Sequence, residues 1–310
     1  MSKHQWFTDL QTILQEGILK LDEPLCKYTA TKLGGAADLL VMPNTIEETV
    51  ATVRYAYEHH IPLLLLGNGS NMVVRDGGVR GIVLHLKNLN TITVDGTSIH
   101  AESGANIIDV SRAAAANGLT GFEFACGIPG SVGGAMAMNA GAYGGEIKDI
   151  IVQSTVVTKT GEVLVLSKEE LALGYRQSII ADEGYFVLSS DFELVPGVQE
   201  EIDAKVADLT FQRESKQPLE YPSAGSVFKR PPGYFAGKLI QDCGMQGKGH
   251  GGAEVSTKHA GFIINKDNAT ATDYVNTINM VKAEVKKTFG VELELEVKIV
   301  GEEKDASIIK

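Results

Sequence analysis

A glycine-rich stretch in the middle of the chain most constrains how it can fold. Between Gly127 and Gly145 there are seven glycines, and Pro129 interrupts the same segment. Helices and strands are disfavoured there, because glycine loses much backbone freedom on folding and proline lacks an N–H donor. Successive N–H groups without covering side chains form concave sites for anions. We therefore predict a loop that cradles phosphate.

A second loop with the same character lies earlier in the chain. Gly67-Asn-Gly-Ser-Asn71 follows the apolar run Pro62 to Leu66, which predicts a buried strand. Ligands of α/β sheets commonly bind at the carboxyl ends of strands, so this loop is a second candidate for phosphate. Asn-Gly is also a strong hairpin dipeptide, and a plain turn is the alternative. Two phosphate loops together predict a dinucleotide cofactor.

Neither loop has the G-x-G-x-x-G spacing of a classical dinucleotide fold, and no G-x-x-x-x-G-K-[ST] segment is present. These absences argue against a Rossmann site and against P-loop chemistry. The seven histidines are scattered and no H-E-x-x-H motif occurs, so we expect no metal site.

A chain of 310 residues is expected to form two or three domains, and the pattern of elements favours three. Apolar periodicity predicts a first helix over 6–19, and then a strand, a helix and a strand over 38–42, 45–60 and 61–66. Short strands and one helix over 106–117 fill 81–194, and a polar helix over 198–216 leaves that region. Helices over 235–243 and 270–289, with strands over 261–265 and 292–300, complete an α+β fold. The expected domains are 1–80, 81–197 and 198–310.

Charge and cysteine usage narrow the class of protein. A net charge of −11 argues against nucleic acid as a partner. The segment 212–260 is locally positive by three charges, which indicates either an anionic small-molecule substrate or an ordinary solvated face. Cys26, Cys126 and Cys243 are far apart, as is typical of a reducing cytosol. Cys126 precedes the glycine loop, so packing and redox roles both stay open for it.

The sequence carries no signal for export or for membrane insertion. Its first residues lack the apolar core of a secretory signal. The uncharged stretch 125–145 contains glycines and a proline that would leave backbone groups unpaired in lipid. We therefore expect a cytoplasmic protein with no membrane partner.

Three further segments each contain one chemically able side chain. They are Gly174-Tyr-Arg-Gln177 with Arg176, Ser223 to Pro232 with Ser226, and Glu294 to Gly301 with Glu296. Taken singly, these side chains predict no more than a surface arginine, a turn hydroxyl and one of several alternating strand carboxylates.

Taken together and in order, these segments and loops resemble the UDP-N-acetylenolpyruvoylglucosamine reductase family over residues 28–302. The resemblance is carried by Lys32-Leu-Gly-Gly-Ala-Ala37, Gly67-Asn-Gly-Ser-Asn71, Gly127-Ile-Pro-Gly-Ser131, Asn139-Ala-Gly-Ala-Tyr-Gly144, Tyr175-Arg176, Gly225-Ser-Val-Phe-Lys229 and Glu296-Val-Lys-Ile-Val-Gly301. Each motif alone is weak, but the ordered set is specific.

The resemblance implies an FAD-binding fold of the vanillyl-alcohol-oxidase type, with two α+β subdomains for FAD and a third α+β domain for the substrate. Some related proteins attach FAD through a histidine. Residues 69–71 offer none, so we expect noncovalent FAD. The implied FAD contacts are Gly67, Asn68, Gly69, Ser70, Asn71, Gly127, Pro129, Gly130, Ser131, Gly133, Gly134, Asn139, Ala140, Gly141, Ala142 and Tyr143.

The resemblance also implies the reaction, which is reduction of UDP-N-acetylglucosamine enolpyruvate to UDP-N-acetylmuramate with NADPH as co-substrate. Flavin N5 would pass a hydride to the vinyl carbon. By position, Arg176 and Glu296 would stabilise the resulting enolate and Ser226 would supply the proton. Arginine suits a carboxylate because its charge is permanent and its fork is bidentate, whereas Glu296 would have to be protonated.

Substrate contacts are implied for Tyr175, Lys216, Lys229 and Arg230. Arg230 departs from the asparagine found in many members, and the chain resembles the shorter form of the family, which lacks a loop with a substrate-covering tyrosine. We expect a monomer or weak dimer. Two alternatives stay open: a different FAD oxidoreductase on the same scaffold, and a noncatalytic sugar-nucleotide-binding protein.

Overall fold

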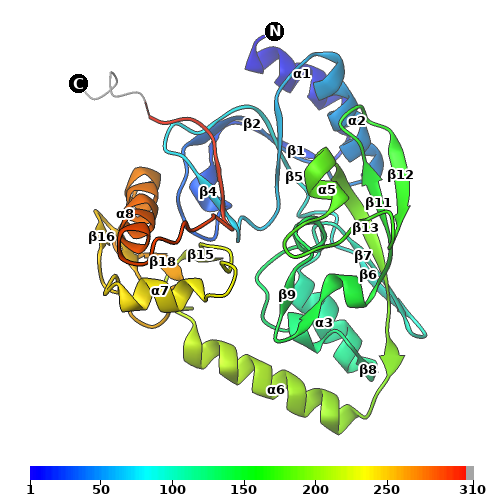
Figure 1. The fold of residues 1–310 in the computed structure, drawn as a ribbon. Coiled ribbons are helices and arrows are strands. Elements are labelled where there is room, and N and C mark those ends of the chain that lie inside the picture. The colour runs from blue at the N-terminus through cyan, green and yellow to red at the C-terminus, as the bar shows by residue number, and fades with distance from the viewer. Residues whose placement is uncertain (305–310) are drawn as a thin grey trace. The chain divides into compact units, whose positions relative to one another are not determined.

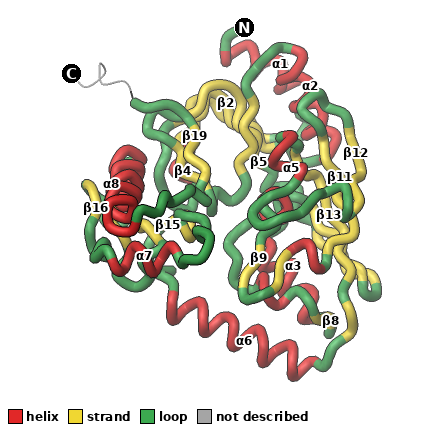
Figure 2. Tube along the Cα trace, viewed as in Figure 1, coloured by secondary structure: helices red, strands yellow, loops and turns green. Residues whose placement is uncertain are grey.

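A computed structural model describes residues 1–304 of the chain (Figure 1). Helices and strands alternate irregularly along the chain (Figure 2). Most sheets are antiparallel or mixed. The chain forms two compact units. Unit 1 comprises 1–21, 39–68 and 81–213, and unit 2 comprises 22–38, 69–80 and the residues from 214 onward.

The first sheet of unit 1 has the strand order β1-β2-β5-β3, and β3 runs parallel to β5. Helix α2 begins where Thr45 caps it, since the Thr45 hydroxyl accepts a hydrogen bond from the Glu48 N–H at 3.1 Å. Apolar side chains of α1, α2 and the sheet form one buried cluster. The elements are α1 (Lys3–Ile13), β1 (Ile18–Pro24), β2 (Ala36–Met42), α2 (Ile46–Glu58), β3 (Leu63–Leu66) and β5 (Val79–His85).

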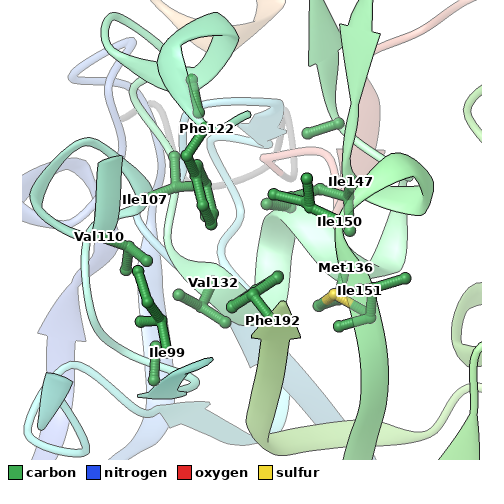
Figure 3. Close-up of a cluster of buried hydrophobic side chains, with 14 of the residues drawn as sticks. Ile99, Ile107, Val110, Phe122, Val132, Met136, Ile147, Ile150, Ile151 and Phe192 are labelled. Carbon is green, nitrogen blue, oxygen red and sulfur yellow. The ribbon is translucent and has the colours of Figure 1, made fainter. Parts of the chain in front are cut away.

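A five-stranded sheet of order β12-β11-β13-β7-β6 forms the rest of unit 1. Figure 3 shows Val132, Phe122 and Phe192 within its buried cluster, where the two phenyl rings meet edge to face with centroids 5.1 Å apart. Burying each such ring contributes about 1.5–3 kcal/mol. The elements are β6 (Ile92–Asp95), β7 (Ser98–Glu102), α3 (Ile107–Ala116), β8 (Leu119–Thr120), α4 (Val132–Ala137), β9 (Gly141–Ala142), β10 (Gly145–Glu146), β11 (Ile151–Val157), β12 (Val163–Ser167), α5 (Ile179–Glu183), β13 (Phe186–Glu193) and β14 (Val195–Pro196).

Unit 2 contains a four-stranded sheet of order β15-β18-β17-β16 and a parallel pair of β4 with β19. Helix α8 has a capping box of Thr270 and Asp273, and Gly290 in the left-handed region ends it. Tyr274 on this helix is fully buried, and its hydroxyl donates to the Ile263 carbonyl. The elements are β4 (Met72–Val74), β15 (Ser223–Ser226), α7 (Ala236–Asp242), β16 (Gly249–His250), β17 (Ala253–Val255), β18 (Phe262–Asn265), α8 (Ala271–Phe289) and β19 (Lys298–Val300), and helix α6 (Gln199–Lys216) connects unit 1 to unit 2.

Two predicted elements are wrong at their ends. The first helix stops at Ile13, and Ile18 and Leu19 begin strand β1. The last predicted strand shrinks to Lys298–Val300, so Glu296 lies in an irregular segment and not in a strand. Local alternation of apolar and polar residues could not reveal either change, because strand pairing decides both.

The expected three-domain division remains a prediction, and the two compact units divide the chain differently. Segments 22–38 and 69–80, expected in the first domain, group with the C-terminal residues. Strand β4 within 69–80 pairs in register with β19, Met72 opposite Lys298. This pairing links residues far apart in the sequence and has no local signal.

Candidate active site

The first predicted phosphate loop begins in unit 1, where Gly67 and Asn68 meet the second loop. A Cβ added to Gly67 would lie 2.9 Å from Ser131 Oγ, so a larger residue at position 67 would require the Ser131 hydroxyl to shift. The Asn68 side chain donates to Asn106 Oδ1 at 2.8 Å, and Asn106 forms an isolated antiparallel bridge with Ser131. Asn106, expected only as the start of a helix, therefore joins both loops.

A buried histidine supports the strand that leads into the first loop. His85 Nδ1 lies 2.8 Å from the Leu66 carbonyl, one residue before Gly67. A carbonyl can only accept, so Nδ1 carries the proton of this bond. Burial lowers the pKa of His85, which favours the neutral ring. No sequence motif distinguished this histidine from the other six.

Backbone donors in the two loops fit a pyrophosphate. Within residues 1–304, the N–H groups of Asn68 and Ser131, which both belong to unit 1, donate no hydrogen bond. Backbone donors in folded proteins are nearly always satisfied, so donors left in glycine-rich loops fit an external anion. These two residues could hold a phosphate group of a nucleotide.

Other amides of the glycine-rich stretch are already used by the protein. Gly133 donates to the Ser103 carbonyl at 2.9 Å, and Gly134 donates to Ser131 Oγ at 3.3 Å. Ala140 donates to the Ala135 carbonyl at 2.8 Å. These three amides are used within the protein because part of the stretch forms helix α4.

The rest of the stretch forms a hairpin in place of the expected loop. Strands β9 and β10 pair through Gly141 opposite Glu146, and the two-residue turn has positive φ at both Tyr143 (53°) and Gly144 (87°). Positive φ at both positions is the signature of a type I′ turn. The Tyr143 side chain at the tip is 43% exposed, which leaves its ring available to a ligand.

Asn139 connects this hairpin to the segment that carries Arg176. It is fully buried with φ of 42°, and its side-chain amide donates to Glu146 Oε2 at 2.7 Å and to the Gly174 carbonyl at 3.0 Å. Its Oδ1 accepts from the Lys148 N–H at 2.9 Å. These bonds make the Asn139 side chain a brace for two loops.

Arg176 lies at the tip of a tight turn in unit 1. Gly174 and Gln177 exchange backbone hydrogen bonds of 3.0 and 3.3 Å around Tyr175 and Arg176. Arg176 has φ of 56°, a region that non-glycine residues rarely adopt and that often marks functional sites. Its Nη2 lies 3.4 Å from the Gly141 carbonyl, and its guanidinium stacks 5.3 Å from the centre of the Tyr175 ring.

Ser226 and Glu296 lie on adjoining segments of unit 2. Ser226 ends β15 opposite Phe262, and the carbonyl of the next residue, Val227, accepts from the Glu296 N–H at 2.8 Å. The Asn71 side chain donates to the Glu296 carbonyl at 3.1 Å. Unit 2 thus places one residue of the predicted FAD loop beside the backbone of the segment that carries Glu296.

The basic residues of unit 2 are only partly gathered at this place. Lys229 lies beside the same segment, where its N–H donates to the Glu294 carbonyl at 2.9 Å and its ammonium lies 3.6 Å from the Glu294 carboxylate. Arg230 stacks 4.0 Å from the centre of the Phe235 ring, and Lys216 ends α6. Lys238 pairs with Asp242, so part of the segment's positive charge belongs to an ordinary surface.

Among residues 1–304, no group of three or more His, Cys, Asp or Glu side chains is placed to hold a metal ion. None of the helices in the described chain is long and apolar enough to span a membrane. The three cysteines are free thiols, and Cys126 Sγ lies 3.9 Å from the Val206 carbonyl of α6, which favours packing for that residue.

Comparison with known proteins identifies the family. An FAD-binding domain model matches residues 37–167, and the C-terminal domain model of UDP-N-acetylenolpyruvoylglucosamine reductase matches 217–300. The chain is 63% identical to the UDP-N-acetylenolpyruvoylglucosamine reductase of Geobacillus thermodenitrificans, over 93% of this chain and 95% of that protein. It is 57% identical to the reductase of that name from Listeria monocytogenes, over 96% of this chain and 99% of that protein.

The same relationship holds in three dimensions. The crystal structure of the reductase from Thermus caldophilus superposes with a TM-score of 0.79 and 33% identity, covering 92% of this chain and 99% of that one. The expected α+β FAD-binding fold and the FAD cofactor are thereby confirmed. This chain belongs to the UDP-N-acetylenolpyruvoylglucosamine reductase family and is an FAD-binding oxidoreductase.

Proposed function

We propose that this protein uses NADPH to reduce the enolpyruvyl double bond of UDP-N-acetylglucosamine enolpyruvate, with Arg176, Ser226 and Glu296 as its catalytic residues. The product is UDP-N-acetylmuramate, a precursor of peptidoglycan, and the enzyme acts in the cytoplasm. The observation that carries the proposal is the pairing of the Ser226 and Glu296 segments through Val227, within a chain of this family.

Noncovalently bound FAD supplies the ability to accept a hydride from NADPH and to donate one to the vinyl carbon. Hydride addition at that carbon leaves negative charge on the α-carbon and the neighbouring carboxylate of the substrate. Arg176 binds this carboxylate with a permanently charged fork, and protonated Glu296 adds a hydrogen bond. The Ser226 hydroxyl gives its proton to the α-carbon, which completes addition of two hydrogens across the double bond.

Substrate binding is proposed for the cationic and aromatic side chains near these residues in sequence. Lys216, Lys229 and Arg230 bind the pyrophosphate or carboxylate of the UDP-sugar, and Tyr175 covers the sugar. The role of Tyr175 is supported by its exposure, since its side chain is 59% exposed at the tip of the Arg176 turn. In Arg230 the guanidinium already stacks on Phe235, which orders it for an anion.

The test is a visible spectrum of the purified protein, repeated anaerobically after NADPH and again after the enolpyruvyl sugar nucleotide. Flavin bands that bleach with NADPH and return with this substrate support the proposal. Bands that bleach but return only with another oxidant point to a different FAD oxidoreductase. A colourless protein that takes up no FAD and still binds UDP-sugars contradicts a catalytic role.

A further inference from the structure

One charged side chain of unit 1 has no protein partner and lies against the glycine-rich loop. Arg213, in the last turn of α6, is half-buried, and among residues 1–304 its guanidinium makes no ion pair and no hydrogen bond. Burial lowers the pKa of Arg213, so the protein environment opposes its charge. Guanidinium groups that leave water are normally paired, because an unpaired charge is costly to desolvate.

The local sequence provides no acid to pair with it. Side chains three and four positions away on a helix are the ones that reach each other. For Arg213 these are Leu209, Thr210, Lys216 and Gln217, none of which is acidic. A partner for the guanidinium must therefore come from elsewhere.

The packing of α6 aims this side chain at the phosphate loop. Cys126 Sγ lies 3.9 Å from the Val206 carbonyl and 3.8 Å from Thr210 Oγ1, so one face of the helix rests on the residue before Gly127. A Cβ added to Gly127 would lie 2.5 Å from Arg213 Cδ. Gly127 therefore leaves room for the arginine stem to pass over the loop.

The surroundings of the guanidinium suit an oxyanion. Tyr143, at the tip of the β9–β10 hairpin, is close enough to interact electrostatically with Arg213. The same loop contains Ser131, whose N–H is without an acceptor in the described chain. A planar guanidinium fork binds two oxygens of a phosphate at once.

We propose that Arg213 is a phosphate-binding residue of the flavin site, with its guanidinium on the pyrophosphate of the dinucleotide beside Gly127. The inference rests on the proposed placement of FAD at the Gly127 loop. Arg213 would be a phosphate-binding side chain on α6, outside residues 37–167 that the FAD-binding domain model matches. The bound pyrophosphate replaces the missing carboxylate partner.

The test measures FAD binding to apoprotein by quenching of flavin fluorescence, with wild type, Arg213→Met and Arg213→Lys. A lost charge-assisted hydrogen bond predicts an FAD dissociation constant about tenfold to a hundredfold higher for Arg213→Met, with Arg213→Lys in between. Wild-type affinity falls with added salt more steeply than that of Arg213→Met. Arg54→Met, an exposed change of the same charge on α2, is the control and leaves FAD binding unchanged.

Melting of the apoproteins separates a ligand role from a structural one. Arg213→Met removes an unpaired charge and keeps an apolar stem, so the apoprotein should melt no lower than wild type. Equal FAD affinity together with a lower melting temperature would show that Arg213 only supports the loop, and would overturn the proposal. If FAD binding is unchanged and the KM for NADPH or for the UDP-sugar rises instead, the flavin assignment is overturned and the phosphate belongs to that nucleotide.

This titration involves no turnover, so failure of the proposed catalytic roles would not affect it. Weaker FAD binding by Arg213→Met in this titration would support the Arg213 assignment, whatever the roles of Ser226 and Arg176.

Discussion

The Arg176 turn in unit 1 and the Ser226–Glu296 pair in unit 2 hold candidate catalytic residues in different ways. Arg176 has a left-handed backbone and depends on a network around the buried Asn139. Ser226 ends a regular strand. The N–H of Glu296 donates an ordinary backbone hydrogen bond to the carbonyl of Val227, the residue after Ser226. Strained residues persist only when their surroundings over-determine them. The first site should therefore be fragile to changes outside it, and the second mainly to changes in the reacting groups.

The largest effect is expected from Ser226→Ala in unit 2. Loss of a general acid typically costs about 10² to 10⁴ in rate. NADPH should still bleach the flavin at the wild-type rate, whereas reoxidation by the enolpyruvyl substrate slows by at least about 100-fold in anaerobic stopped flow. The backbone pairing of Ser226 with Phe262 survives the change, so stability should not fall. Unchanged reoxidation would remove Ser226 from the mechanism.

Asn139→Ala tests the fragility of the first site. The substitution leaves the Gly174 carbonyl, the Glu146 carboxylate and the Lys148 N–H without this partner. A loss of about 2–4 kcal/mol in the free energy of unfolding is expected, because buried partners stay unsatisfied. Urea unfolding of the apoprotein measures it.

Asn117→Ala is the matched control, since this exposed residue makes one side-chain bond, to the Ala113 carbonyl, at the end of α3. It should cost no more than about 1 kcal/mol. The two variants should also differ in activity. Asn139→Ala should slow substrate reduction because it loosens the Arg176 turn, whereas Asn117→Ala should not. Full stability together with full activity in Asn139→Ala would contradict the proposed support of the Arg176 turn by Asn139.

Gly225→Ala tests the second site, in unit 2. Gly225 has φ of 71°, and an added Cβ would meet no atom within 4 Å, so only backbone strain opposes the change. We expect a cost of about 1–2 kcal/mol. Gly96→Ala is the control, because Gly96 has φ of 59° with equally open surroundings in the β6–β7 turn. Gly225→Ala and Gly96→Ala should lose similar amounts of stability. Only Gly225→Ala should slow reoxidation of the flavin by substrate, since Gly225 directly precedes Ser226.

The smallest expected effect is on the pH dependence of the free energy of unfolding, to which each unit contributes one histidine. Burial lowers the pKa of His85 in unit 1 and of His259 in unit 2. The unfolded chain binds protons on both near pH 6.5, whereas the folded chain binds them only at lower pH. Their contribution to stability is therefore complete above about pH 6.5 and is lost as pH falls below it.

Urea unfolding at pH 7.5 and 5.5 measures this loss. His85→Gln and His259→Gln should each reduce the pH dependence, and the double variant should reduce it most. Exposed His4→Gln is the control for the loss of a histidine side chain. The carboxylates with lowered pKa, such as Glu48 and Glu123, act below this window because their ordinary pKa is near 4.5.

Local sequence signals predicted much of the fold and some of the site. The helices predicted over 45–60 and 270–289 form close to their expected bounds, and Thr45, Thr270 with Asp273 and Gly290 cap their ends in the structure. The sequence likewise predicted a strand leading to Gly67, which the structure has as β3. Asn106 and His85 were missed as site residues, because their partners Asn68 and Leu66 lie 38 and 19 positions away.

The sequence by itself determined the longer helices, most of the longer strands, the loop after β3 and, by resemblance, the family. These depend on periodicity, capping and motif order, which are local or linear properties. The tertiary structure alone decided that the glycine-rich stretch divides into α4 and a hairpin, that 69–80 joins the C-terminal residues, and that Glu296 lies beside Val227. Such contacts gain their free energy from pairing and burial between distant segments, and no single segment encodes them.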